Sequence, residues 1–199
     1  MNRIITISRE FGSGGRTIGR MAAEKLGIAC YDAELIEKIA EKSGFAEGYV
    51  RENHDGNANR SWLGSVLAGR DYFGESNQDY LWKVQRQVIL EIAEKESCVI
   101  VGRCADYILK DKADLLTVFI HASLEDRAER IVKVYGESEE SPEKRLKDKD
   151  KRRRSYYHFY TDMEWGLATH YDICLDSGRI GIERCADMIA ALYNKTPVH

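Results

Sequence analysis

The sequence predicts an α/β protein in which helices cover both faces of a parallel β-sheet. Short apolar runs alternate with amphipathic stretches of helical periodicity along the chain, and this alternation is typical of parallel sheets. The first apolar run, residues 3–8, leads into a glycine-rich turn and then a helical pattern. Because ligands bind at the carboxyl ends of such strands, the polar residues that follow each strand are the candidates for a site.

Length and composition indicate one globular domain. The chain has 199 residues, 43% of them hydrophobic and 32% charged, as in ordinary globular proteins. A net charge of −3 argues against bulk binding to nucleic acid. The five cysteines form no C-x-x-C pair and are expected to be reduced, buried thiols. No apolar run is long enough to cross a membrane, so we expect a cytoplasmic protein without nucleic-acid or membrane partners.

The first part of the chain predicts two strand–helix units followed by an irregular segment. We expect a strand over 3–8, a helix over 16–26, a strand over 28–31 and a helix that follows Asp32, which could cap it. Residues 44–79 are rich in Gly, Asn, Asp and aromatic residues. We interpret them as an insertion that closes over a ligand, the alternative being a surface connection.

The second part predicts further alternation. Ser123 and Ser141 are expected to cap two helices, the second of which follows an acidic stretch at 135–141. The expected elements are a helix over 80–94, strands over 98–102, 115–121 and 173–175, and helices over 123–134, from 142 onward and over 182–192.

The glycine-rich turn after the first strand predicts a phosphate site. Backbone N–H groups of Gly12, Ser13, Gly14 and Gly15 could surround phosphate oxygens at a helix N-terminus. The hydroxyl of Thr17 could hold Mg²⁺. The alternative is a tight turn without a ligand.

This loop departs from the standard P-loop, G-x-x-x-x-G-K-[ST]. When Gly14 is taken as the second glycine, Gly15 stands at the lysine position and Arg9 at the first glycine. Thr17 falls one residue beyond the usual hydroxyl. The loop is therefore P-loop-like but lacks its usual cation, and Arg9 and Arg16 are the nearest replacements.

Other polar residues at strand ends extend the predicted site. Asp32 could orient an acceptor or a metal-bound water, or could only cap a helix. Arg103 follows a buried strand and could clamp a phosphate, or form a salt bridge instead. The basic run 144–154 could bring arginines to a phosphate cluster. Its alternatives are a solvated helix and a nucleic-acid surface, and we favour the phosphate cluster.

Aromatic residues gather after the basic run. They are expected to pack against the core, and the alternative is a homodimer interface. The cluster comprises Tyr156, Tyr157, Phe159, Tyr160 and Trp165.

The chain resembles the nucleoside monophosphate kinases, and among them the cytidylate-kinase-like family. The resemblance spans nearly the whole chain, and its first segment is fairly specific. The segments that carry it are 7–18 (ISREFGSGGRTI), 31–36 (YDAELI), 101–106 (VGRCAD), 119–130 (FIHASLEDRAER), the basic helix with Asp150, Arg153 and Tyr156-Tyr157, and 171–176 (YDICLD).

The resemblance implies a P-loop NTP hydrolase-like fold that uses ATP and Mg²⁺. The core would comprise residues 1–43, 80–134 and 158–199, with an acceptor-binding insertion at 44–79 and a lid at 135–157. The reaction would transfer the γ-phosphoryl group of ATP to a small phosphate acceptor, for which CMP or dCMP is expected. Alternatives are a P-loop kinase for another small acceptor and a nucleotide-binding module without catalysis.

The resemblance also implies roles for individual residues. The glycine loop with Arg16 and Thr17 would bind ATP and Mg²⁺. Arg103, Asp32 and Asp150 would bind the acceptor. The residues expected to act in catalysis are Asp32, Arg130, Lys149 and Arg153. Apart from the resemblance, we hypothesise that Arg9 or Arg16, which flank the loop, supplies the charge of the missing lysine.

Overall fold

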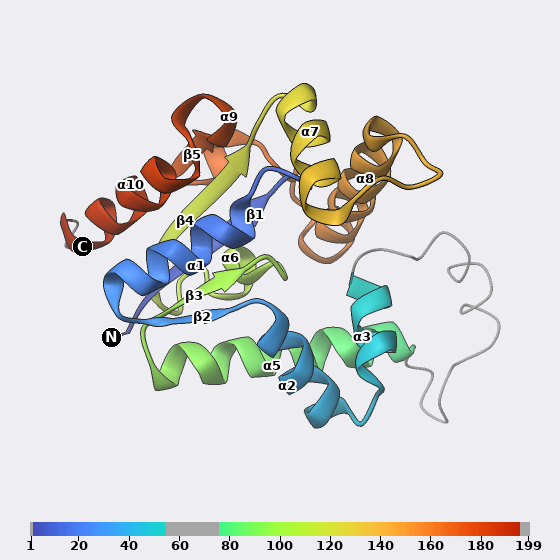
Figure 1. Cartoon of the computed structure of the whole chain (residues 1–199). Coiled ribbons are helices and arrows are strands. Elements are labelled where there is room, and N and C mark those ends of the chain that lie inside the picture. The colour runs from blue at the N-terminus through green and yellow to red at the C-terminus, as the bar shows by residue number, and fades with distance from the viewer. Residues whose placement is uncertain (1, 55–75, 196–199) are drawn as a thin grey trace.

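The computed structural model describes residues 2–54 and 76–195 (Figure 1). Within these ranges, five strands form one parallel sheet in the order β2-β3-β1-β4-β5. The predicted α/β class is confirmed. The strands are β1 (Arg3–Arg9), β2 (Ala29–Tyr31), β3 (Cys98–Val101), β4 (Asp114–His121) and β5 (Ile173–Asp176).

The central position of β1 determines where the site lies. β1 pairs with β3 from Ile4↔Cys98 and with β4 as far as Arg9↔Ile120. Because all the strands are parallel, the glycine loop after β1 and the turn after β3 meet at one edge of the sheet.

Helices cover both faces of the sheet (Figure 1). Alternate residues of β1 point to opposite faces, so Ile4 packs in one core cluster and Ile5 in another. The cluster of Ile5 includes α1 (Gly15–Leu26) and α10 (Ile182–Lys195). The cluster of Ile4 includes α2 (Ala33–Ser43), α5 (Asn77–Lys95) and α6 (Ala105–Ile108).

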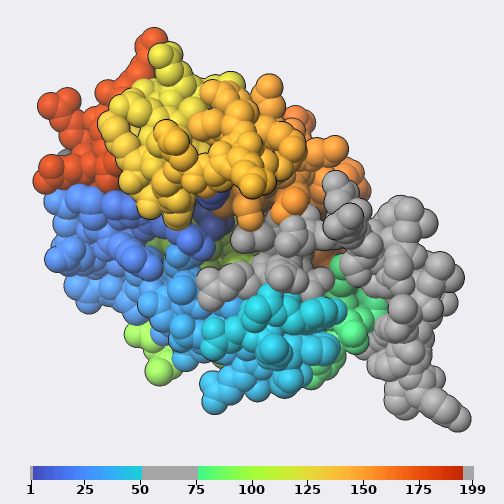
Figure 2. Space-filling view, turned by 45° about the vertical axis from the view of Figure 1, so that its right-hand side comes forward, coloured from blue at the N-terminus to red at the C-terminus, as the bar shows by residue number. Residues whose placement is uncertain are grey.

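Two helices flank the carboxyl edge of the sheet. α7 (Leu124–Tyr135) packs against α8 (Pro142–Thr161), and Figure 2 shows them as one continuous surface above α1. α8 continues without a break past residue 157. The remaining short elements are α3 (Glu47–His54), η1 (Ala168–His170) and α9 (Ser177–Ile180).

Local signals placed most helix starts correctly. Ser123 and Ser141 cap α7 and α8 by accepting the N–H groups of Asp126 and Lys144. Asp32 occupies the N-cap position of α2, but its side chain makes no capping hydrogen bond. The carboxylate instead pairs with Arg16, so the prediction that it caps the helix was wrong.

The described residues of the segment 44–79, which are 44–54 and 76–79, are more regular than the composition of the segment suggested. Residues 47–54 form α3, and α5 begins at Asn77, three residues earlier than predicted. Residues 55–75 lie outside the described part. Across the ranges 2–54 and 76–195, no helix combines the length and apolar character that a membrane span requires.

Candidate active site

The loop between β1 and α1 has the backbone geometry of an anion site. Gly12 and Gly14 have φ of 79° and 80°, in the left-handed region that favours glycine. A Cβ at Gly12 would lie 2.9 Å from Ile131 Cγ2, so the loop lies close against α7. No side chain caps α1 at Gly14. The N-terminal N–H groups of α1 and the positive end of its dipole therefore suit a phosphate group.

Three arginines hold the outer side of this loop. Arg153 Nη1 donates to the carbonyl of Arg9 at 3.0 Å, and Arg130 Nη1 donates to the carbonyl of Gly12 at 2.8 Å. Arg127 Nη1 donates to the carbonyl of Phe11 at 3.2 Å. These bonds fix the orientation of the peptide groups that approach α1.

Asp150 completes the support of the loop. Its side chain is buried, and Oδ1 accepts the N–H of Phe11 at 2.7 Å. Oδ2 pairs with Arg127 at 2.6 Å. Both oxygens are thus engaged within the protein, at the contact between α8 and the glycine loop.

Sequence reasoning missed three of the supporting residues. Arg127 was noticed only as part of a family segment. Glu10 accepts the N–H of Ala122 at 3.3 Å and lies 3.4 Å from Arg127 Nε, and burial raises its pKa. Ser177 donates to the carbonyl of Ser13 at 2.6 Å. Their partners lie far away in the chain, and no local pattern indicated them.

A cavity of about 50 Å³ lies beside the loop, at the carboxyl ends of β1 and β3. A single water needs roughly 10–15 Å³, so the cavity has room for several waters or a phosphate group. It brings together Arg9, Arg16, Arg103 and Arg153. The full lining is Ser8, Arg9, Arg16, Gly102, Arg103, Cys104, Arg153, Tyr156, Tyr157 and Trp165.

Two arginines of this cavity have unsatisfied donors. Arg9 Nε and Arg103 Nη1 are buried, and neither has a hydrogen-bond partner among the residues that the structure describes. Burial, followed by the charge of Arg153, lowers the pKa of Arg9. Burial lowers the pKa of Arg103 to about 10. Unpaired buried donors of this kind are unfavourable unless a ligand accepts from them, and anions are ligands that can accept such bonds.

The turn that carries Arg103 is strained. Arg103 and Cys104 have φ of 63° and 52°, and non-glycine residues rarely adopt this region. Gln85, fully buried on α5, donates to the carbonyl of Arg103 at 3.0 Å. Strain maintained by the surrounding structure is common at functional sites.

The other predicted site residues do not line this cavity. Asp32 is buried, and its carboxylate lies 2.9 Å from Arg16 Nε. Arg130 lies at the glycine loop, as described, and Lys149 lies on α8. The exposed Thr17 stands in the first turn of α1.

The donor set near the loop fits Mg²⁺ bound together with phosphates. Mg²⁺ commonly uses one or two protein ligands together with phosphate oxygens, and the hydroxyl of Thr17 could supply one. Among the residues described, no group of three or more His, Cys, Asp and Glu could hold a metal ion by itself.

Comparison with known proteins identifies the family. The model of the cytidylate kinase-like family matches residues 4–179. The chain belongs to the cytidylate kinase-like family. A cytidylate kinase from Archaeoglobus fulgidus is 32% identical over 191 residues, which cover 93% of this chain and 91% of the relative.

Solved structures with a similar fold are also found. An uncharacterised protein from Eubacterium ventriosum has a TM-score of 0.72 at 28% identity, covering 98% of this chain and 100% of its own. A shikimate kinase from Acinetobacter baumannii has a TM-score of 0.55 at 17% identity, with 99% and 96% coverage, and shares the fold alone. Family and fold together support phosphoryl transfer to a small acceptor.

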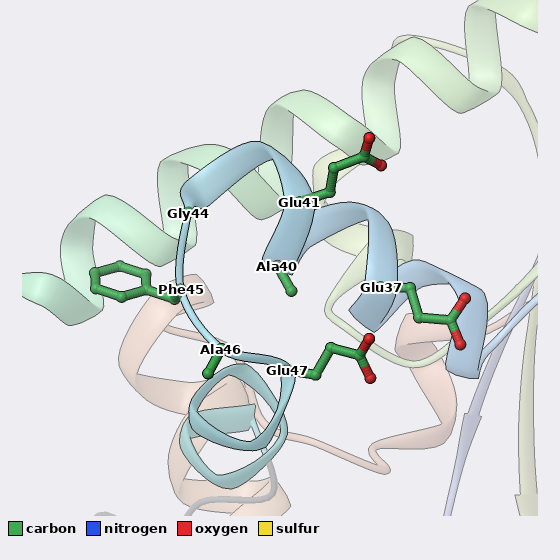
Figure 3. Close-up of a pocket in the computed structure, with 7 residues that line it drawn as sticks. All are labelled: Glu37, Ala40, Glu41, Gly44, Phe45, Ala46 and Glu47. Carbon is green, nitrogen blue, oxygen red and sulfur yellow. The ribbon is translucent and has the colours of Figure 1, made fainter.

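A second hollow of this cytidylate-kinase-like protein is unsuited to phosphate. It lies where α2 meets α3 and is lined by Glu37, Glu41 and Glu47 together with residues 44–46. Figure 3 shows Glu37 and Glu47 extending to the same side of it, whereas Glu41 points away. Three carboxylates repel an anion, so the arginine-lined cavity remains the candidate site.

The aromatic cluster joins α8 to the core and to α5. Tyr157 and Trp165 are buried, and Trp82 of α5 stacks on Tyr160 with ring centroids 4.3 Å apart. Phe159 is 66% exposed. Most of the cluster therefore packs internally, as we expected.

Proposed function

We propose that this protein transfers the γ-phosphoryl group of ATP to a nucleoside monophosphate, with CMP or dCMP as the expected acceptor. The observation that carries the proposal is the arginine-lined cavity directly beside an uncapped glycine loop. The glycine loop suits the phosphates of ATP, and the arginine-lined cavity suits an anionic group of the acceptor.

The donor would bind at the glycine loop. N–H groups of Gly12, Ser13, Gly14 and Gly15, with those of Arg16 and Thr17, would surround its phosphates. Mg²⁺, held by the Thr17 hydroxyl and phosphate oxygens, would neutralise charge on the transferring group.

The acceptor would bind in the cavity. Arg103 would hold its phosphate, and Asp32 would orient it through the pair with Arg16. Asp150 remains a predicted acceptor ligand, although its present contacts suit support of the loop. Arg130, Lys149 and Arg153 would stabilise the transferring charge, because positioning and neutralisation account for most of this catalysis.

The test is ADP formation from Mg-ATP with CMP, dCMP, UMP, AMP, GMP and no acceptor, with the product identified by mass spectrometry. We expect acceptor-dependent ADP with CMP or dCMP and formation of the corresponding diphosphate. Shikimate and gluconate should be included, because shikimate kinases and a gluconokinase share the fold. Phosphorylation of one of these instead would replace the acceptor in the proposal.

A second candidate is a nucleotide-binding module without turnover. Gly15 at the lysine position favours it, because that lysine stabilises transferring charge. The same assay separates the two candidates. A non-catalytic module would bind ATP in calorimetry but form no ADP above background with any acceptor.

A further inference from the structure

The side chain of Arg9 runs from the end of β1 across the start of α1 to the turn after β3. A Cβ at Gly15 would lie 2.6 Å from Arg9 Cβ and 2.9 Å from its Cγ. A Cβ at Gly102 would overlap Arg9 Nη1. Two glycines, far apart in the sequence, thus leave the space that this one side chain occupies.

The head of Arg9 lies in a strongly positive environment. Burial is the main cause that lowers the pKa of Arg9, and the charges of Arg153, Arg16 and Arg103 lower it further, whereas the charge of Asp32 raises it. In the described part of the chain, Arg9 Nε and Arg103 Nη1 are buried and have no hydrogen-bond partner. Several guanidinium groups with one carboxylate repel one another, so the arrangement favours the binding of an anion between them.

Arg9 and Arg16 differ in what their side chains already contact. Arg16 Nε lies 2.9 Å from Asp32, and the Arg16 side chain is 49% exposed. Arg9 makes no such carboxylate contact within residues 2–54 and 76–195, and its backbone is fixed by the bond from Arg153 to its carbonyl. Of the two arginines beside the loop, Arg9 is the more buried and the less compensated.

We propose that Arg9 is the catalytic cation of this site, placed between the donor and acceptor phosphates. Position 15 is a glycine, on this proposal, because a side chain there would occupy the space of the Arg9 side chain. The proposal rests on the proposed function. In the step that Arg9 would assist, an acceptor phosphate oxygen forms a bond to the γ-phosphorus while the bond from that phosphorus to the β–γ bridging oxygen breaks. ADP leaves with the electron pair, and a dianionic acceptor needs no proton transfer.

The first experiment compares three alanine variants at saturating Mg-ATP and CMP. We expect Arg9→Ala to lower kcat by at least about 10³-fold, the lower range for a cation that neutralises transferring phosphoryl charge. The loss of kcat in Arg16→Ala should be at least tenfold smaller than the loss in Arg9→Ala. Arg20→Ala, which removes an exposed arginine of α1, should match the wild type. An Arg9→Ala variant within tenfold of wild-type kcat, with ADP affinity unchanged, overturns the proposal.

The second experiment tests the glycine clearance. Gly102→Ala should displace Arg9 and lower kcat, but should add little further loss in the Arg9→Ala background, because the overlapping group is then gone. Gly27→Ala is the control, since Gly27 has φ 65° and a Cβ added there would meet no atom within 4 Å. Gly27→Ala therefore introduces the strain of a positive φ at a non-glycine residue without a steric overlap. Equal losses from Gly102→Ala in both backgrounds contradict the clearance.

A restored lysine gives a further readout. Gly15→Lys should fail to raise kcat above wild type, because its side chain would enter the space of Arg9 Cβ and Cγ. A gain in kcat would show that position 15 lacks a cation for another reason and would overturn the proposal.

Failure of the proposed function can be distinguished from failure of this inference. If the wild type forms no ADP with any acceptor, the proposed reaction is wrong. Binding of inorganic phosphate, measured by calorimetry, then tests separately whether Arg9 is an anion ligand. At least tenfold weaker binding by Arg9→Ala, with Arg20→Ala unchanged, supports Arg9 as an anion ligand, and equal binding overturns it.

Discussion

The backbone N–H of Phe11 donates a hydrogen bond to Asp150 Oδ1 over 2.7 Å, although 139 residues separate the two in the chain. Arg127 closes a ring, because its Nη1 contacts Asp150 Oδ2 and the carbonyl of Phe11. The ring joins the glycine loop to α7 and α8. Its groups are largely buried, so each depends on the others for its hydrogen bonds.

Asp150→Asn should therefore disturb the donor site. The change keeps the shape but removes the buried carboxylate that pairs with Arg127 Nη1 and leaves the more exposed Glu10 as a carboxylate partner. We therefore expect a loss of about 2 kcal/mol in the free energy of unfolding. The KM for ATP should rise about tenfold as the loop loosens. Urea unfolding and initial rates measure the two effects.

The control for this variant is Lys151→Ala, an exposed position of the same helix. This variant should change the KM for ATP by no more than about twofold and the free energy of unfolding by no more than about 0.5 kcal/mol. A rise in the KM of the acceptor with the KM for ATP unchanged would instead support Asp150 as an acceptor ligand.

Gln85→Leu should weaken acceptor binding. The variant removes the donor that holds the Arg103 carbonyl, so the strained turn should relax and move the guanidinium. One lost buried hydrogen bond corresponds to about 1–2 kcal/mol, or a KM for the acceptor roughly 5- to 30-fold higher. Gln87→Leu, at a neighbouring exposed position, is the matched control. Equal KM values for Gln85→Leu and Gln87→Leu would rule out this role.

Ser177→Ala should weaken the binding of ATP more than the binding of the phosphate acceptor. Its hydroxyl donates to the carbonyl of Ser13 at 2.6 Å, which ties the glycine loop to the turn after β5. Loss of this bond, about 1 kcal/mol, should raise the KM for ATP about fivefold. Ser155→Ala, exposed on α8, serves for comparison. A larger change in the KM of the acceptor than in that of ATP would contradict the assignment.

Asp106→Asn should change how stability depends on pH. Burial raises the pKa of Asp106 above 3.8, although Tyr157 donates a hydrogen bond to its Oδ2 at 2.9 Å. The native state therefore holds this proton more tightly than the unfolded state does. The resulting stabilisation is complete below the unfolded pKa and is lost as pH rises through the raised native pKa.

Asparagine cannot titrate, so the variant should lose less stability than the wild type between pH 4 and pH 8. Urea unfolding across that range measures the difference. Parallel curves for the two proteins would show that Asp106 does not titrate in this window.

The sequence by itself determined the five strands, the long helices and the glycine loop of the described part, but not the short helices α3, α6 and α9. Residues 3–26 encode a strand, a glycine turn and a helix through local periodicity and the backbone freedom of Gly12 and Gly14, and these signals need no distant partner. The caps at Ser123 and Ser141 are equally local. Family resemblance pointed to Arg103 and Arg153, which the fold brings into one cavity.

Only the tertiary structure decided what the charged groups contact. From the sequence, Asp32 could cap a helix or orient an acceptor or a metal-bound water, and the structure shows that it pairs with Arg16 from a different helix. Arg127 carried no local signal, and the path of Arg9 depends on the empty space at Gly15 and Gly102, from two separate segments. Parallel strands place the ends of distant segments side by side, so these contacts follow from strand order and packing, which local periodicity does not specify.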